Sequence, residues 1–90
     1  MIKKFRKLPV VIEAIQYVSE PTNSFQECCD FIGEENLSDG TSIEEEYIGI
    51  STDEGEMEAR MGDWIIKGIA GEFYPVKDEI FRLTYEAVDE

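Results

Sequence analysis

The sequence contains no histidine, and its two cysteines, Cys28 and Cys29, are neighbours. The absence of histidine excludes Ser-His-Asp triads, imidazole general bases and zinc sites with histidine ligands. Two adjacent cysteines do not make a disulfide framework, and reduced thiols are typical of a cytosolic protein. A reactive thiolate needs a lowered pKa, which an acidic neighbourhood does not provide. We therefore expect Cys28 and Cys29 to be buried structural residues.

Long apolar runs are also missing. The run at residues 8–12 ends at Glu13, which makes it shorter than the apolar part of a signal peptide and far too short to span a bilayer. We therefore expect neither export nor a membrane anchor, and a location in the cytoplasm.

Positive charge is scarce over most of the chain. The sequence has 8 Lys and Arg against 21 Asp and Glu, a formal net charge of −13. No Lys or Arg occurs from Leu8 to Ala59, a stretch that holds fourteen carboxylates between Glu13 and Glu58. Such a field repels nucleic-acid phosphates and attracts basic proteins. The alternative is that the charge only keeps a small domain soluble.

The four cations Lys3, Lys4, Arg6 and Lys7 lie in the first seven residues. We interpret residues 1–90 as one domain in which residues 1–8 form a basic N-terminal arm, and the sequence leaves open whether this arm is ordered. A chain of this length buries only about 60–65% of its unfolded surface, so its core is thin.

The first half predicts a strand and a helix. Residues 9–18 are rich in β-branched residues, with apolar side chains at both parities, so we expect a strand covered on both faces. Ser24 and Glu27 have the spacing of a capping box. An apolar stripe then follows at helical spacing and ends before Gly33, a natural C-cap; its members are Phe25, Cys28, Cys29 and Ile32.

The second half predicts strands joined by tight turns. We expect strands at residues 43–51, 56–61, 64–67, 72–76 and 83–88, and one helical turn at 77–81. Glycines at 55, 62, 68 and 71 supply the turns. Short connections make neighbouring strands antiparallel. The predicted fold is α+β: a small curved antiparallel sheet or partly open barrel of about five strands, with one short α-helix packed on it.

Two groups of residues are candidates for binding. Trp64, Lys67, Phe73, Tyr74 and Arg82 combine aromatic and basic side chains that could hold a small anionic ligand such as a nucleotide, or serve as core aromatics flanked by solubilising charges. Glu44, Glu45 and Glu46 offer carboxylates to a basic partner. Consecutive residues on a strand point to opposite faces, so these acids favour a solvated surface over a metal or acid-base site. We expect no catalytic residues, metal or cofactor.

Both ends of the chain resemble a widespread group of small phage and prophage proteins. The opening K-K-F-R-K-L-P-V-V-I-E-A-I-Q-Y and the closing block, which begins G-D-W-I-I-K-G-I-A-G-E-F-Y-P, carry the resemblance. It covers about the first seventeen and the last thirty residues. The group is uncharacterised, so no activity or site residue is implied. Members often have a cysteine after F-Y-P, where this chain has Val76, so the resemblance implies no functional thiol there.

Three hypotheses follow. The first is a non-enzymatic phage or prophage protein that is a binding module or an inhibitor and acts on a basic host or phage protein in the bacterial cytoplasm. The alternative is a protein that sequesters a nucleotide signal at the region of Trp64. The third is an enzyme that uses carboxylates and a divalent metal. Exposed sheet edges also permit a homodimer.

Overall fold

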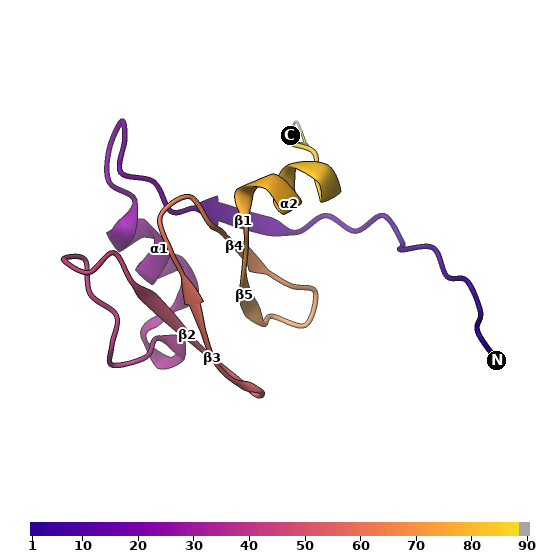
Figure 1. Cartoon of the computed structure of the whole chain (residues 1–90), viewed down its shortest axis with the longest axis horizontal. Helices are drawn as coiled ribbons and strands as arrows, with labels where there is room; N and C mark the ends of the chain where they lie inside the picture. The colour runs from indigo at the N-terminus through magenta and orange to yellow at the C-terminus, as the bar shows by residue number, and fades with distance from the viewer. Residues whose placement is uncertain (89–90) are drawn as a thin grey trace.

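The computed structural model describes residues 1–88 and contains five strands and two α-helices in that range (Figure 1). The elements are β1 (Glu13–Gln16), α1 (Phe25–Ile32), a 3-10 turn η1 (Glu34–Asn36), β2 (Ile48–Thr52), β3 (Gly55–Ala59), β4 (Trp64–Lys67), β5 (Phe73–Val76) and α2 (Asp78–Thr84). The small α+β fold with antiparallel strands and a short packed helix is confirmed. The strands form two sheets, and neither closes into a barrel in the described part of the chain.

The three-stranded sheet has the order β1-β4-β5, with all neighbours antiparallel. Its register pairs Ala14 with Ile66 and Ile66 with Tyr74, so these three side chains share one face of the sheet. The turn between β4 and β5 is closed by the amide of Gly68, which donates to the carbonyl of Glu72 at 2.7 Å. The other face, which includes Ile65, contributes to the core.

The two-stranded sheet is the hairpin β2–β3, where the predicted turn is confirmed. Thr52 pairs with Gly55, which has a φ of 117°. Glycine adopts this conformation without the steric strain that a side chain would cause. Ile48 pairs with Ala59, and both are fully buried. The hairpin thus turns Ile48, Ile50 and Ala59 to the core and leaves residues 55–58 of β3 in solvent.

The core lies between the two sheets and α1. Its fully or nearly fully buried members are Tyr17, Cys28, Ile32, Ile48, Ile50, Ala59 and Ile65. The apolar stripe of α1 is confirmed, since Cys28, Cys29 and Ile32 are buried, and Gly33 ends the helix with a φ of 92°. Phe31 of α1 meets Phe73 of β5 edge to face, with 5.5 Å between ring centroids.

The predicted capping box is wrong. Ser24 occupies the N-cap position, but its hydroxyl is used at the end of β1, where it donates to the carbonyl of Gln16 and accepts from the amide of Val18, both at 2.8 Å. The amide of Phe25 instead donates to the side-chain oxygen of Asn23 at 2.8 Å. The hydroxyl of Ser24 thus joins the helix to the strand and does not cap the helix.

Three predicted strands differ from the structure. The strand expected at residues 9–18 is limited to Glu13–Gln16, because nothing pairs with residues 9–12, and Val11 is 73% exposed. The strand expected at 43–51 begins at Ile48. The strand expected at 83–88 is absent from the described chain, because α2 extends to Thr84.

Residues 1–8 extend away from the body (Figure 1). All eight are exposed. The radius of gyration is 14.2 Å, against about 12 Å expected for a compact chain of this length. The projecting arm accounts for the excess.

Candidate functional site: an acidic surface beside Arg60

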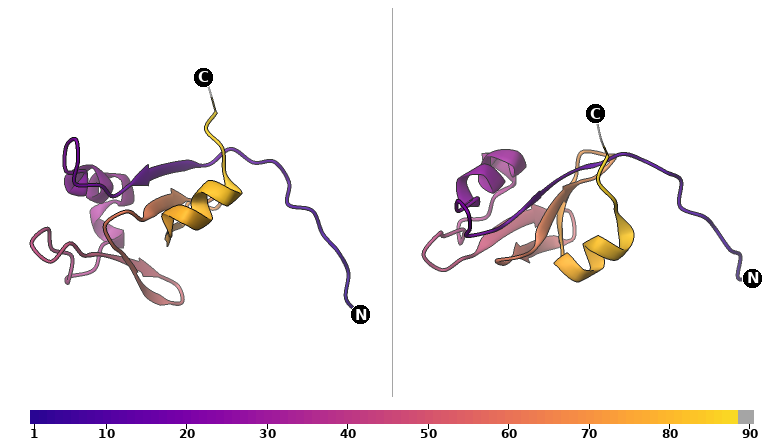
Figure 2. Two further views of the ribbon diagram at one scale, coloured as in Figure 1. Left: turned by 45° about the horizontal axis from the view of Figure 1, so that its top comes forward. Right: turned by 90° about the horizontal axis from the view of Figure 1, so that it is seen from above.

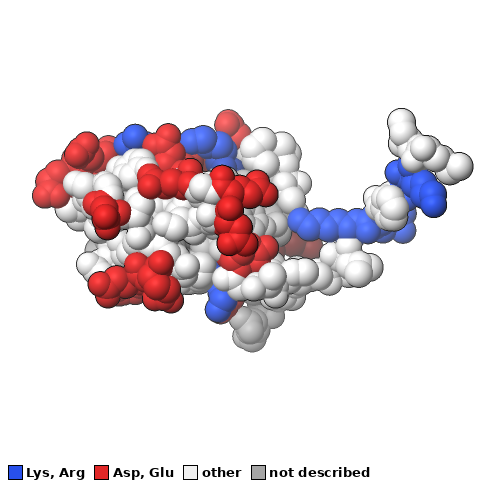
Figure 3. All heavy atoms as spheres, turned by 90° about the horizontal axis from the view of Figure 1, so that it is seen from below, with Lys and Arg blue, Asp and Glu red and all other residues white. Residues whose placement is uncertain are grey.

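Exposed carboxylates are spread over the body of the protein. All fourteen between Glu13 and Glu58 are exposed. Figure 3 shows acidic side chains spread over one face of the body, and cations along the projecting arm. We use the name acidic surface for the carboxylates of the β2–β3 hairpin and of the turn that precedes β2, namely Glu44, Glu45, Glu46, Asp53, Glu54, Glu56 and Glu58.

The three consecutive glutamates lie in a tight turn and not in a strand. Ser42 and Tyr47 pair across its base, and the amide of Glu46 donates to the carbonyl of Ile43 at 3.2 Å. In a strand continuing the β2 alternation, Glu44 and Glu46 would share the inward face of Ile48, where burying unpaired charges is costly. The turn instead leaves all three side chains in solvent, with Glu46 at a φ of 52°.

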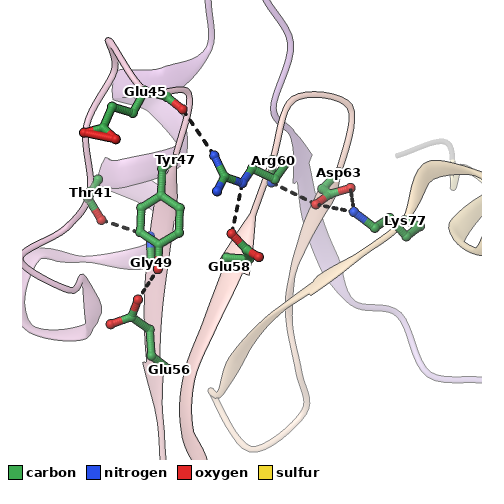
Figure 4. Close-up of polar contacts among 9 residues, drawn as sticks. All are labelled: Thr41, Glu45, Tyr47, Gly49, Glu56, Glu58, Arg60, Asp63 and Lys77. Atoms are coloured by element: carbon green, nitrogen blue, oxygen red, sulfur yellow. Dashed lines mark hydrogen bonds and ion pairs between the residues drawn. The ribbon is translucent and has the colours of Figure 1, made fainter.

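Arg60 connects this turn to β3 (Figure 4). Its Nε donates to Glu58 Oε2 at 2.9 Å, and its Nη1 donates to the carbonyl of Glu45 at 3.2 Å. The guanidinium also lies over the ring of Tyr47, 4.9 Å from the centroid. Each of these contacts contributes little free energy in solvent. Because the guanidinium is planar and has several donors, it can make all three contacts at once, and together they hold the acidic turn against the hairpin.

Tyr47 is the second support of the acidic surface. Its hydroxyl donates to Glu56 Oε2, and the hydrogen bond to that carboxylate raises the pKa of the Tyr47 phenol. The phenol therefore stays protonated at neutral pH. Thr41 joins the same patch from the other side, since its hydroxyl accepts from the amide of Gly49 at 3.0 Å.

Lys77 and Arg82 in the second half are also paired with carboxylates. Lys77 Nζ lies 3.2 Å from Asp63 Oδ1, and this carboxylate is only 4% exposed and also accepts from the amide of Arg60 at 2.8 Å. Arg82 pairs with Asp78 at 2.9 Å. Among residues 1–88, Glu58 is therefore the one carboxylate of the acidic surface that forms an ion pair. Within the described residues, the acidic surface therefore keeps almost all of its charge unneutralised.

The five residues predicted to hold a small ligand do not converge. Trp64 and Tyr74 share the face of the three-stranded sheet that α2 covers, whereas Lys67 and Phe73 pair with each other on the opposite face. Phe73 packs against the core. Arg82 approaches Trp64 only through Asp78, to which both donate hydrogen bonds.

Trp64 fixes α2 to the sheet. Its indole stacks on Phe81 with 4.1 Å between ring centroids, and its Nε1 donates to Asp78 Oδ1 at 2.8 Å. The hydrogen bonds from Trp64 and Arg82 lower the pKa of Asp78. Sequence reasoning missed Asp78, although its spacing of four residues from Arg82 on a helix was a readable signal.

Burial also raises the pKa of two thiols and one phenol. Burial raises the pKa of both Cys28 and Cys29, so their thiols stay protonated at neutral pH. Burial, followed by a hydrogen bond with Tyr85, raises the pKa of Tyr74 to about 12. Within residues 1–88, no three Cys, Asp or Glu side chains are grouped as a metal ion would require.

No protein-family model matches this sequence, and no curated protein and no solved structure is significantly similar to it. None of the helices in the described part of the chain has the length and apolar character needed to cross a membrane. Function must therefore be argued from the residues and their geometry.

Proposed function

We propose that the protein is a non-enzymatic binding module or inhibitor, encoded by a phage or prophage, whose acidic surface binds a basic host or phage protein in the bacterial cytoplasm. The observation that carries this proposal concerns residues 1–88, where the exposed carboxylates form no internal ion pair apart from that of Glu58 with Arg60. The phage origin rests on the resemblance of the two ends of the chain.

Charge of this kind is suited to recognition. Unpaired carboxylates on a compact body steer a positively charged partner into encounter and reject wrong partners of like charge. The turn at residues 43–46 is held by Arg60, so its glutamates are presented in a defined arrangement and less order is lost on binding. A row of carboxylates on a hairpin also resembles a row of phosphates, which makes a nucleic-acid-binding protein the natural class of target.

The test compares two triple variants with equal loss of charge. In the first, Glu44→Gln, Glu45→Gln and Glu46→Gln neutralise the turn while keeping side-chain size. In the control, Glu13→Gln, Glu20→Gln and Glu27→Gln neutralise three exposed carboxylates outside the acidic surface. Partners are captured from host lysate at low and high salt and identified by mass spectrometry, and the association rate is then measured with the purified partner.

We expect the wild type and the control to retain a basic partner at low salt and to lose it at high salt, because charges are screened beyond about 10 Å at 0.1 M salt. The turn variant should associate at least tenfold more slowly than the control. If no basic partner is retained at low salt, or if both triple variants lose it equally, the acidic surface is not the binding site.

A further inference from the structure

The N-terminal arm carries apolar side chains that the rest of its own chain does not cover. Ile2 is 98% exposed, Phe5 91% and Leu8 76%, and the four cations of the arm lie between them. An extended segment of this composition places several large apolar groups in water, which is unfavourable unless another surface buries them.

A groove lies at the root of this arm. Residues 9–12 form one wall, and Phe81 of α2 with the following residues 84–88 forms the other, with Ala14 and Trp64 between them. Its volume is about 570 Å³. Figure 2 shows the segment after α2 returning to the side of the N-terminal segment. The groove is mostly apolar and falls within the size range of protein binding sites.

The arm and the rest of the molecule have opposite charge. The arm contributes +4 to the formal net charge of −13, so the remainder carries −17 (−13 minus +4). Glu86 is the carboxylate that lines the groove. Within residues 1–88, none of the arm cations forms an ion pair with its own chain.

One residue of the arm already contacts the groove of its own chain. Lys7 Nζ lies 3.4 Å from the hydroxyl of Tyr85 and 5.1 Å from the centroid of its ring, and Tyr85 lines the groove. A cation over an aromatic face is a favourable contact. The arm then leaves the groove of its own chain and extends into solvent (Figure 1).

We propose that residues 2–8 of one copy bind in the groove of a second copy, so that two chains exchange arms in a two-fold symmetric dimer. Residues 9–12 line the groove and continue directly into the arm, so each copy carries its arm beside its own groove. In a two-fold arrangement each arm then lies near the groove of the other copy, which gives the closed, reciprocal interface proposed here. Phe5 and Leu8 enter the groove, and the cations face the partner's carboxylates. This surface is separate from the acidic surface above, so either proposal can fail alone.

Sedimentation equilibrium of the full-length chain tests the dimer. We expect twice the monomer mass of 10.3 kDa at micromolar concentration. The double variant Phe5→Asp with Leu8→Asp should raise the dissociation constant at least tenfold, because both side chains leave water only in the dimer. Ile43→Asp is the control, because it adds a charge at an exposed apolar residue of the 43–46 turn, outside the groove. We expect this variant to sediment as a dimer, like the wild type. Circular dichroism confirms that each variant is folded.

A mixing experiment distinguishes arm exchange from other dimers. Ala87→Arg places a bulky cation at an exposed residue in the groove and blocks it, while the arm stays intact. We expect this variant and the Phe5→Asp, Leu8→Asp variant to be monomers alone and to form a heterodimer when mixed, because one intact arm then meets one intact groove. A monomeric wild type, a dimer that survives the arm substitutions, or no association on mixing would each overturn the proposal.

Discussion

The two α-helices of this protein are of similar length but are held in different ways. Helix α1 buries Cys28, Cys29 and Ile32, whereas α2 has no buried residue. Helix α1 is part of the core, and α2 is fixed to the face of the three-stranded sheet by the stack of Trp64 on Phe81 and by hydrogen bonds to Asp78. We therefore expect substitutions of buried residues in α1 to destabilise the fold more than substitutions in α2.

The largest expected effect is therefore in α1. Ile32→Ala removes a fully buried side chain and should lower the free energy of unfolding by about 2–4 kcal/mol. Leu83→Ala, at an exposed position of α2, is the matched control and should change it by less than about 0.5 kcal/mol. Urea denaturation measures both. Equal losses would mean that α2 is as integral to the fold as α1.

An intermediate effect is expected where α2 meets the sheet. Phe81→Ala removes the ring that stacks on both Trp64 and Tyr85 and should lower the free energy of unfolding by about 1–3 kcal/mol. Trp64 emission should shift to the red, because its ring becomes hydrated while the core stays folded. Glu79→Ala, an exposed neighbour on the same helix, should leave the emission unchanged. An unchanged emission spectrum in Phe81→Ala would show that the stack does not shield Trp64.

The smallest effect concerns the pH dependence of α2 docking. The hydrogen bonds from Trp64 and Arg82 lower the pKa of Asp78 in the folded protein, so folding favours its charged form. This contribution is present above the pKa of an ordinary aspartate, about 3.9, and is lost as the pH falls through the lowered folded value.

Trp64 fluorescence should therefore change only below about pH 3.9, the pKa of an ordinary aspartate. Asp78→Asn should abolish this change. A transition of the same midpoint in Asp78→Asn would assign it to other carboxylates.

Some parts of the fold could be predicted because neighbouring residues determine them. The stripe of α1 and the hairpin turn before Gly55 each follow from spacing and glycine chemistry within a few residues. The prediction for residues 9–12 was wrong because their β-branched composition favours a strand, yet a strand also needs a hydrogen-bonding neighbour, and β4 ends at Lys67, opposite Glu13. The strand predicted at residues 83–88 was also wrong. Residues 83–84 belong instead to α2, which packs on the surface of the three-stranded sheet.

The candidate site shows the same division. The exposure of Glu44, Glu45 and Glu46 could be predicted from charge alone, since three adjacent carboxylates are too costly to bury. The support from Arg60 could not, because its contact with the carbonyl of Glu45 joins residues fifteen positions apart. The separation of Trp64 from Phe73 depends on strand parity and on which face α2 covers, and neither was available from composition.

The sequence by itself determined the sign and placement of charge, the short elements and the absence of histidine chemistry, because these depend on residue identity and local spacing. Only the tertiary structure decided that Asp63 is neutralised by Lys77, because these two residues meet only after β4 and β5 pair. It also decided that residues 9–12 and 84–88 form the two walls of one groove. Such contacts join distant parts of the chain, and they exist only once the chain has paid the entropy of bringing those parts together.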